Sequence, residues 1–271
     1  MVYQQSSGDI SFMPSYTTSD IRNIAFVGHA GSGKTSLVEA LLCEAGAIHQ
    51  KGLVESGTTL SDFTDEEKKA GYSIFPAFSH CKIENHLLNF VDTPGSGDFL
   101  GQALSVLPGF ETVAVVVNAS TGVEPVTRRM MDRVAEMKLA RIIVINKIDH
   151  ENASVENVVE VVRKTFGYSC LPINLPSSDG KSVIDCFANS SGDAAFSSVE
   201  AAHKQLIEQI VEVDEDLMTK YLEEGEVKAE DLSAACVKAI CDGHPVPICF
   251  TSARDHNSPQ TSVGVKELLK I

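Results

Sequence analysis

The strongest signal in the sequence is Gly28-His29-Ala30-Gly31-Ser32-Gly33-Lys34-Thr35. It matches the phosphate-binding pattern G-x-x-x-x-G-K-[ST], and it stands between an apolar β-type run at 24–27 and a helical pattern at 36–42. In such a loop the backbone N–H groups converge on phosphate oxygens, the lysine neutralises charge at the β- and γ-phosphates, and the threonine hydroxyl can bind Mg²⁺. The sequence therefore predicts a nucleoside triphosphate site that extends from Gly28 to Ser36, with Thr35 as a metal ligand.

A second signal follows the strands predicted over 73–83 and 87–91, the latter of which ends in Asp92-Thr93-Pro94-Gly95. An acidic residue at the carboxyl end of a strand beside the first strand can hold Mg²⁺ through water. A glycine at this point lets a backbone N–H approach the γ-phosphate. Asp92 is therefore a predicted metal ligand, and Gly95 is a predicted phosphate contact.

The third signal is Asn146-Lys147-Ile148-Asp149, which follows a continuous apolar run at 141–145. That run and another at 111–118 are typical of parallel strands buried on both faces. Only guanine presents N1–H and an N2 amine on one edge, so the Asp149 carboxylate selects it, whereas adenine would leave that carboxylate buried and unpaired. Lys147 can cover the ring and Asn146 can brace the loop. A strand predicted at 246–250 ends in Thr251-Ser252-Ala253, where Ser252 and Ala253 are expected to offer backbone N–H groups to guanine O6.

Composition limits the class of protein. The chain has 271 residues and is 43% hydrophobic, which is enough for one large domain or a domain with an inserted subdomain. Residues 1–20 are polar and aperiodic, so a flexible tail is expected there. The start lacks a signal-peptide layout, no apolar run reaches the length of a membrane span, and the seven cysteines form no C-x-x-C pair. We expect a soluble, cytoplasmic protein with reduced, buried cysteines and no membrane partner.

The net charge of −15 argues against a surface that binds nucleic acid through phosphate neutralisation alone, and no DNA partner is expected. Residues 1–150 carry 12 basic and 17 acidic side chains, whereas residues 151–271 carry 10 and 20. The only candidate cluster for RNA contact is Arg128, Arg129 and Arg133 on one predicted helix. A solvated helix face is the preferred explanation for those arginines.

The remaining elements complete a predicted architecture. Residues 46–73 form a long irregular loop, typical of functional segments, in which Thr64-Asp65-Glu66-Glu67 has capping-box spacing and predicts a short helix. Further helices are predicted at 124–138, 151–166, 199–223, 229–242 and 264–271, and short strands within 171–180 and 183–187.

These elements predict an α/β fold of the P-loop NTPase class: a mainly parallel six-stranded sheet with helices on both faces, plus an inserted α/β subdomain. The domain is expected to span 21–271, the insertion about 167–245, and further domains are expected beyond the helix that stops at Ile271.

Together these motifs resemble the GTP-binding domain of translational GTPases, and most closely the elongation factor G family. Five motifs stand in family order, at 28–35, 71–74, 92–95, 146–149 and 251–253. The resemblance implies GTP and GDP as ligands, Mg²⁺ held by Thr35, Ser73 and Asp92, and GTP hydrolysis linked to elongation, translocation or ribosome disassembly. It also implies a ribosome partner. The acidic segment 199–223 is then a candidate dock for a basic stalk protein, although solubility explains its charge equally well.

Three positions depart from the family pattern. The family usually has Thr at position 73, Asp at position 31 and, at position 96, the His that orients the attacking water; here these are Ser73, Gly31 and Ser96. The predicted catalytic positions are Lys34, Gly95 and Ser96. Because Ser96 is short, we expect slow intrinsic hydrolysis. Two functions stay open: a ribosome-coupled GTPase, and a GTP-sensing binding module with negligible hydrolysis. An ATP-using kinase is disfavoured by the guanine motif at 146–149.

Overall fold

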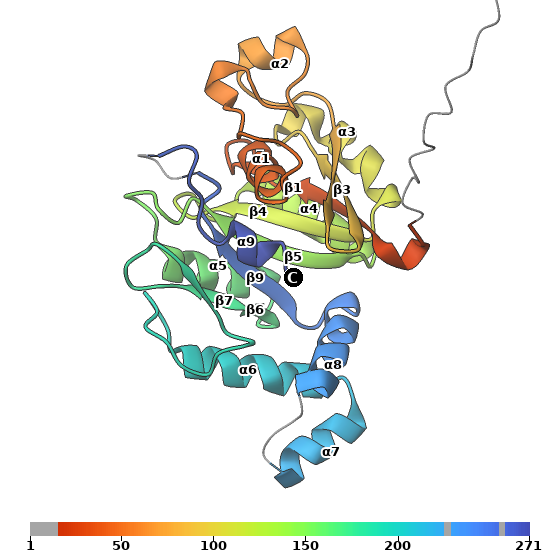
Figure 1. Cartoon of the computed structure of the whole chain (residues 1–271), viewed down its shortest axis with the longest axis vertical. Coiled ribbons are helices and arrows are strands. Elements are labelled where there is room, and N and C mark those ends of the chain that lie inside the picture. The colour runs from red at the N-terminus through yellow and green to blue at the C-terminus, as the bar shows by residue number, and fades with distance from the viewer. Residues whose placement is uncertain (1–15, 225–228, 255–257) are drawn as a thin grey trace, which may run out of the picture.

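A computed structural model of the protein describes residues 16–224, 229–254 and 258–271 (Figure 1). Its centre is a seven-stranded sheet in the order β2-β3-β1-β4-β5-β9-β6. The strands of this sheet are β1 (Ile21–Val27), β2 (Ala77–Ile83), β3 (His86–Asp92), β4 (Thr112–Asn118), β5 (Ala140–Asn146), β6 (Cys170–Pro172) and β9 (Val246–Thr251). Only the β2–β3 pair is antiparallel among them. The predicted mainly parallel sheet is confirmed, with β6 as a seventh strand where six were expected.

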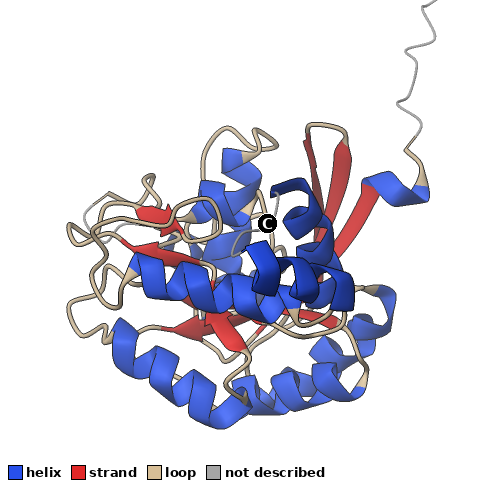
Figure 2. Ribbon diagram, turned by 90° about the horizontal axis from the view of Figure 1, so that it is seen from below, coloured by secondary structure: helices blue, strands red, loops and turns tan. Residues whose placement is uncertain are grey.

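Helices cover both faces of this sheet (Figure 2). They are α1 (Lys34–Glu44), α2 (Asp65–Ala70), α3 (Leu100–Val106), α4 (Pro125–Glu136), α5 (Val155–Phe166), α6 (Val199–Val211), α7 (Glu215–Glu224), α8 (Ala229–Cys241) and α9 (Val265–Leu268). Buried side chains of α3, α4 and α5 pack on one face, and those of α1, α8 and α9 pack on the other. The buried side chains of α6 contribute to both clusters. In the part of the chain that the structure describes, no helix has the length and apolar character that a membrane crossing requires.

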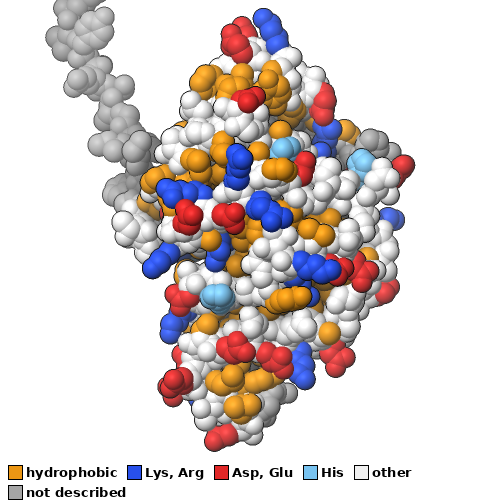
Figure 3. Space-filling view, turned by 180° about the vertical axis from the view of Figure 1, so that it is seen from behind, with side chains coloured by type: hydrophobic (Ala, Val, Ile, Leu, Met, Phe, Trp, Pro, Cys, Tyr) orange, Lys and Arg blue, Asp and Glu red, His pale blue; other side chains and the backbone are white. Residues whose placement is uncertain are grey.

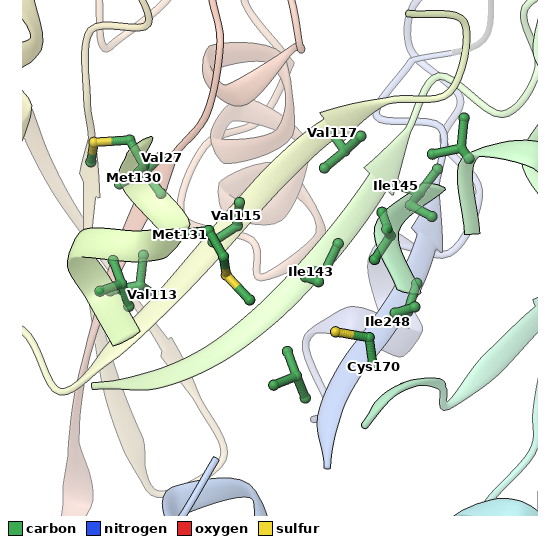
Figure 4. Close-up of a cluster of buried hydrophobic side chains, with 14 of the residues drawn as sticks. Val27, Val113, Val115, Val117, Met130, Met131, Ile143, Ile145, Cys170 and Ile248 are labelled. Carbon is green, nitrogen blue, oxygen red and sulfur yellow. The ribbon is translucent and has the colours of Figure 1, made fainter. Parts of the chain in front are cut away.

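The core explains why the central strands are continuous apolar runs. Val113, Val115 and Val117 of β4 point to the face covered by α4, where Met130 and Met131 pack against them (Figure 4). The alternate residues of the same strand join the cluster on the opposite face. Because a strand between two layers of helices buries both of its faces, both sets of side chains must be apolar. The sheet therefore holds its carboxyl edge rigidly, and the predicted motifs lie along that edge.

The loop between α1 and β2 is organised around one short helix. As predicted, α2 begins with a capping box: the Thr64 hydroxyl accepts from the Glu67 N–H at 3.2 Å. The fully buried Glu67 carboxylate also accepts from the N–H groups of Ile74 (2.9 Å) and Phe75 (3.0 Å). These amides are thereby withdrawn from strand pairing. The strand predicted over 73–83 consequently begins only at Ala77, and Ser73 lies in the loop.

Residues between α5 and β9 differ in detail from the prediction. Besides β6, they contain an antiparallel pair, β7 (Asn174–Pro176) and β8 (Val183–Asp185), and the helices α6 to α8. The single helix predicted over 199–223 is wrong, because the Asp214 carboxylate accepts from the N–H groups of Asp216 (3.1 Å) and Leu217 (3.2 Å). This cap starts a new helix. The apolar stripe that suggested one helix continues across the break.

Three smaller expectations also change. Residues 1–15 of the predicted tail lie outside the described residues, and Thr18–Asp20 form a 3₁₀ turn that leads into β1. The helix predicted to begin at 264 covers only the four residues of α9. The cysteines were expected to be buried, but Cys241 is exposed and Cys43 and Cys236 are partly exposed.

Candidate functional site

The loops at the carboxyl ends of β1, β3, β5 and β9 meet in one cleft of about 390 Å³. The predicted site residues that line it are Ala30, Gly31, Gly33, Lys34, Thr35, Ser36, Ser73, Gly95, Ser96, Asn146, Lys147, Asp149 and Ala253. The other predicted residues are not among the lining residues; they are Gly28, His29, Ser32, Asp92 and Ser252. Each of those is hydrogen-bonded to a lining residue. The amine of Lys34 and the carboxylate of Asp149 therefore belong to the same cleft.

The backbone of the phosphate loop comes so close to its neighbours that two positions accept only glycine. Gly28 has φ +144°, and a Cβ there would lie 2.3 Å from the Val116 carbonyl oxygen. Gly33 has φ +90°, and its Cβ would lie 2.4 Å from the Asn146 amide nitrogen. L-residues avoid such dihedrals, and neither neighbour leaves space for a side chain. The loop is a cradle of bare main chain, which fits the oxygens of a phosphate group.

Lys34 is a buried cation at the base of this cradle. Its ammonium group donates to the carbonyl oxygens of Gly28 and His29, both at 3.0 Å. Burial lowers the pKa of Lys34 to about 8, and the nearby carboxylates, chiefly that of Asp92, counteract part of this shift. An anionic phosphate beside the amine would favour its charged form. Lys34 is thus suited to neutralise phosphate charge.

His29 is held from outside the cleft by the first turn of α4. Its backbone N–H donates to the Thr127 hydroxyl at 3.2 Å, and its Nε2 lies 3.4 Å from the Glu124 carboxylate. The His29 carbonyl, by contrast, accepts from Lys34. His29 therefore contributes its main chain to the site and anchors the loop to α4 through its side chain.

Four oxygen-bearing side chains gather beside the cradle. The Thr35 hydroxyl donates to Asp92 Oδ2 at 2.6 Å and lies 3.2 Å from the Ser73 hydroxyl, which itself donates to Asp62 Oδ1 at 2.8 Å. Asp92 Oδ1 is buried and has no hydrogen-bond partner among the described residues. Burial raises the pKa of Asp92 to about 6, although the Lys34 cation opposes that shift. Hydroxyl and carboxylate oxygens are the ligands that Mg²⁺ prefers, so this group fits the metal.

Asp62 is a member of this group that the sequence did not reveal. Its side chain is 2% exposed, and its second carboxylate oxygen accepts from the Thr59 hydroxyl at 3.1 Å. It lies in the irregular loop, which has no hydrophobic periodicity and no predicted strand end. The sequence therefore gives no signal that distinguishes Asp62 from the other acidic residues of that loop. Only the folded path of the loop brings it to Ser73.

Two further buried charges fix the same loop, and neither was predicted. Glu39 of α1 accepts from the N–H groups of Gly52 (2.8 Å) and Leu60. The Lys51 ammonium donates to the carbonyl oxygens of Ala253 (3.1 Å) and Thr261 (2.8 Å). Burial without a hydrogen-bond partner would be costly for either charge, and both are satisfied by main chain. The loop is thereby attached to α1 on one side and to the segment after β9 on the other.

Asn146 connects the loops that follow β5 and β9 to the phosphate loop. Its amide nitrogen donates to the Ser32 carbonyl at 3.1 Å, and its oxygen accepts from the Ala253 N–H at 3.0 Å and the Thr251 hydroxyl at 3.2 Å. Lys147, which has φ +65°, donates to the Gly31 carbonyl at 2.9 Å. These bonds fix the distance between the phosphate end and the opposite end of the cleft.

Asp149 lies at that opposite end. The Ser252 hydroxyl donates to Asp149 Oδ1 at 2.6 Å and lies 2.9 Å from the Arg254 carbonyl oxygen. The carboxylate is held at the cleft wall, where it can accept two donors from the edge of a guanine ring. The N–H groups of Ser252 and Ala253 were expected to face guanine O6, but both are bonded within the protein: that of Ser252 donates to the Val263 carbonyl at 2.9 Å, and that of Ala253 donates to Asn146. Ser252 instead contributes its hydroxyl, which orients Asp149.

The third loop brings Gly95 and Ser96 to the rim. The Gly95 carbonyl accepts from the Ala30 N–H at 2.9 Å, and a Cβ at Gly95 would lie 2.4 Å from the Lys34 amine. The Ser96 hydroxyl accepts from the Asp98 N–H at 3.4 Å and caps a 3₁₀ turn at Gly97–Phe99. Ser96 thus reaches the cleft as a short capping side chain.

Comparison with known proteins agrees with this geometry. Residues 19–271 match the family described as elongation factor Tu GTP binding domain. The chain is 30% identical over 267 residues to an elongation factor G-like protein of Mycobacterium tuberculosis, and the match covers 93% of this chain and 36% of that protein. It is also 30% identical over 268 residues to elongation factor G of Fervidobacterium nodosum, with 92% and 38% covered.

A solved crystal structure of a protein from Thermus thermophilus has the same fold. It superimposes with a TM-score of 0.82 at 34% sequence identity, and the match covers 93% of this chain and 39% of that one. The chain therefore spans a little over a third of the length of these relatives. It belongs to the translational GTPases and is a GTP-binding domain of the elongation-factor-G-like kind.

Proposed function

We propose that this domain binds GTP and GDP with Mg²⁺ in the cleft and hydrolyses GTP as part of an elongation-factor-G-like factor in the cytoplasm. Its work would be ribosome-linked elongation, translocation or ribosome disassembly. One observation carries the proposal: Lys34 and Asp149 line one cleft, and Asn146 joins their loops. A single nucleotide could therefore place its triphosphate at Lys34 and its guanine at Asp149.

Each group has a task in the reaction. The phosphate loop and Lys34 would hold the β- and γ-phosphates, and Thr35, Ser73 and Asp92 would hold Mg²⁺, which supplies positive charge beside those phosphates when bound. In hydrolysis, a water oxygen bonds to the γ-phosphorus while the bond to the bridging oxygen breaks. GDP leaves with the electron pair, and the proton of the water passes to phosphate or solvent. Gly95 and Ser96 line the cleft, and a Cβ at Gly95 would lie 2.4 Å from the Lys34 amine, so these two residues would help to align that water.

A second candidate is a GTP-sensing module that turns over negligibly. The observation in its favour is the position of Ser96: its hydroxyl caps the turn at Gly97–Phe99, and serine is too short to aim water as an imidazole does. In that function GTP would stabilise one arrangement of residues 46–73 without being consumed. Both candidates share the fold and the nucleotide, and only the rate of phosphate release separates them.

The acidic helices α6 and α7 support a protein partner. Acidic side chains gather at the lower end of the molecule, where α7 lies (Figure 3). Between α6 and the end of α5 there is a groove of about 240 Å³, whose charged lining residues are Glu208, Glu212 and the single cation Arg163. A basic ribosomal stalk protein would complement this charge. The docking proposal is separate from nucleotide binding and fails if charge reversal at Glu208 and Glu212 leaves ribosome binding unchanged.

The decisive experiment measures GTP turnover by the full-length protein with and without ribosomes. We expect binding of GDP and GTP but not of ATP in competition, and phosphate release that ribosomes accelerate. A Lys34→Ala variant, which removes the buried cation, is the matched control and should lose nucleotide affinity. Ribosome-independent, negligible turnover with normal GTP binding would favour the sensing module. Preference for ATP would contradict both candidates.

A further inference from the structure

The nucleoside end of the cleft is spanned by an ion pair between two loops. Arg254 follows Ser252-Ala253 directly, and its guanidinium donates to both carboxylate oxygens of Glu55, each at 2.7 Å. Glu55 lies in the 3₁₀ turn Val54–Ser56 of the irregular loop. Both residues line the cleft together with Lys147 and Asp149. The pair therefore closes one side of the opening where a guanine nucleoside would lie.

The backbone on both sides of this ion pair is fixed by hydrogen bonds to buried charged side chains. On the Glu55 side, Glu39 binds the N–H groups of Gly52 and Leu60, on either side of the turn. On the Arg254 side, Lys51 binds the carbonyl oxygen of Ala253, the residue before Arg254. The ion pair is thus the outermost of several links between the same two loops. It is also the most exposed of them, with side chains 37% and 64% accessible, so it can open while the inner links persist.

The charges of the two residues are mutually stabilised. The hydrogen bonds from Arg254 hold the pKa of Glu55 below its ordinary value, and those to Glu55 raise the pKa of Arg254. Both groups therefore stay charged at neutral pH. A bidentate arginine–carboxylate pair also fixes the relative orientation of the two chains, which a lysine could not do.

We propose that Arg254 and Glu55 form a clasp over the nucleoside end of the cleft, and that opening of this clasp controls how fast nucleotide enters and leaves. The inference rests on the proposed binding of guanine nucleotides. The clasp links protein to protein, so its loss lowers the barrier to passage in both directions. Association and dissociation rates should rise together, and the dissociation constant should change little. A residue that bonds directly to nucleotide would instead raise the dissociation rate and the dissociation constant in parallel.

The test is stopped-flow fluorescence with N-methylanthraniloyl-GDP on the full-length protein. In Arg254→Gln and Glu55→Gln we expect both rates to rise about threefold, as suits an exposed ion pair, with the dissociation constant within about twofold of wild type. The swapped double variant Arg254→Glu/Glu55→Arg should bring both rates back toward wild type. Arg133→Gln is the matched control, because it breaks an exposed arginine–glutamate pair with Glu136 on α4, away from the cleft. Its rates should equal those of wild type.

Several results would overturn the clasp. Unchanged rates in both single variants would do so, as would a rise in dissociation alone with a matching rise in the dissociation constant. Unfolding of both glutamine variants would also count against it, because an exposed pair contributes little to stability. If the folded wild type failed to bind N-methylanthraniloyl-GDP, the proposed function would fall together with the clasp. Normal binding with unchanged variant rates would remove the clasp alone.

Discussion

The two ends of the cleft are built in different ways. The phosphate end is formed by main chain from one short motif, with Gly28 and Gly33 at positions where a Cβ would collide with its neighbours. The nucleoside end is formed by side chains from three separate loops, among them Asp149 and Arg254, and it is partly exposed. Main chain cannot adjust without moving the sheet, whereas side-chain bonds can be broken one at a time. Under the proposed function, the phosphate end would fix where a nucleotide binds, and the nucleoside end would decide which base binds and how fast it exchanges.

The largest effect is expected from adding a side chain to the phosphate end. Gly28→Ala combines a φ of +144° with a contact of 2.3 Å to the Val116 carbonyl, which belongs to a central strand that cannot yield. We expect GDP affinity to fall about 1000-fold, equivalent to about 4 kcal/mol. Titration calorimetry measures the loss. Gly46→Ala is the control, because Gly46 also has positive φ (+72°) but open space around it. Equal affinity losses in both variants would contradict the account of the cradle.

At the nucleoside end, Asp149→Asn should change which base is preferred. The amide presents one acceptor and one donor, so it loses a charged bond to the guanine edge and gains a match to xanthine, which has an oxygen in place of the amine. We expect GDP affinity to fall about 100-fold and xanthosine diphosphate to bind more tightly than GDP. Competition binding of the two nucleotides is the measurement, with the exposed Asp179→Asn as control. A uniform loss for both bases would mean that Asp149 serves the fold and not recognition.

The variant Ser96→His tests whether the phosphate end lacks a side chain that orients the water attacking the γ-phosphate. We expect single-turnover GTP hydrolysis to rise about tenfold, less than a fully evolved catalytic group provides, because the surrounding turn is shaped for serine. GDP affinity should stay at its wild-type value. Ser105→His on α3 is a control for the general effect of the substitution. A fast wild type, or no gain in Ser96→His, would count against slow intrinsic hydrolysis.

A smaller effect than these three is expected from loosening the loop that carries Glu55. Glu39→Gln weakens the bonds to the Gly52 and Leu60 amides but leaves the phosphate cradle intact. We expect GDP dissociation to become about fivefold faster, since bonds to a charged acceptor are replaced by weaker ones. Glu44→Gln, an exposed position at the end of the same helix, is the control. Should the affinity fall as far as in Gly28→Ala, the two ends of the cleft would not be separable.

The difference between the two ends of the cleft also explains which site residues could be predicted from the sequence. The phosphate loop and the loop at 146–149 are contiguous, and each follows an apolar strand, so their positions could be inferred from spacing alone. Glu55, Asp62 and Arg254 could not be found in this way, because their neighbours are set by the path of an irregular loop. The break between α6 and α7 was missed because the apolar stripe runs on past Asp214. The strand β6 was missed as part of the main sheet because three residues carry too short a pattern to be assigned.

The buried carboxylate of Glu67 ties together two points that lie on opposite sides of it in the chain. It binds the N–H of Thr64 and those of Ile74 and Phe75, so the intervening segment is closed into a ring by one side chain. Because one side chain holds both ends of this segment, any displacement of α2 would carry Ser73 with it. The Ser73 hydroxyl lies 3.2 Å from that of Thr35, so a fluorescent probe on α2 would report a change in the distance between these two hydroxyls.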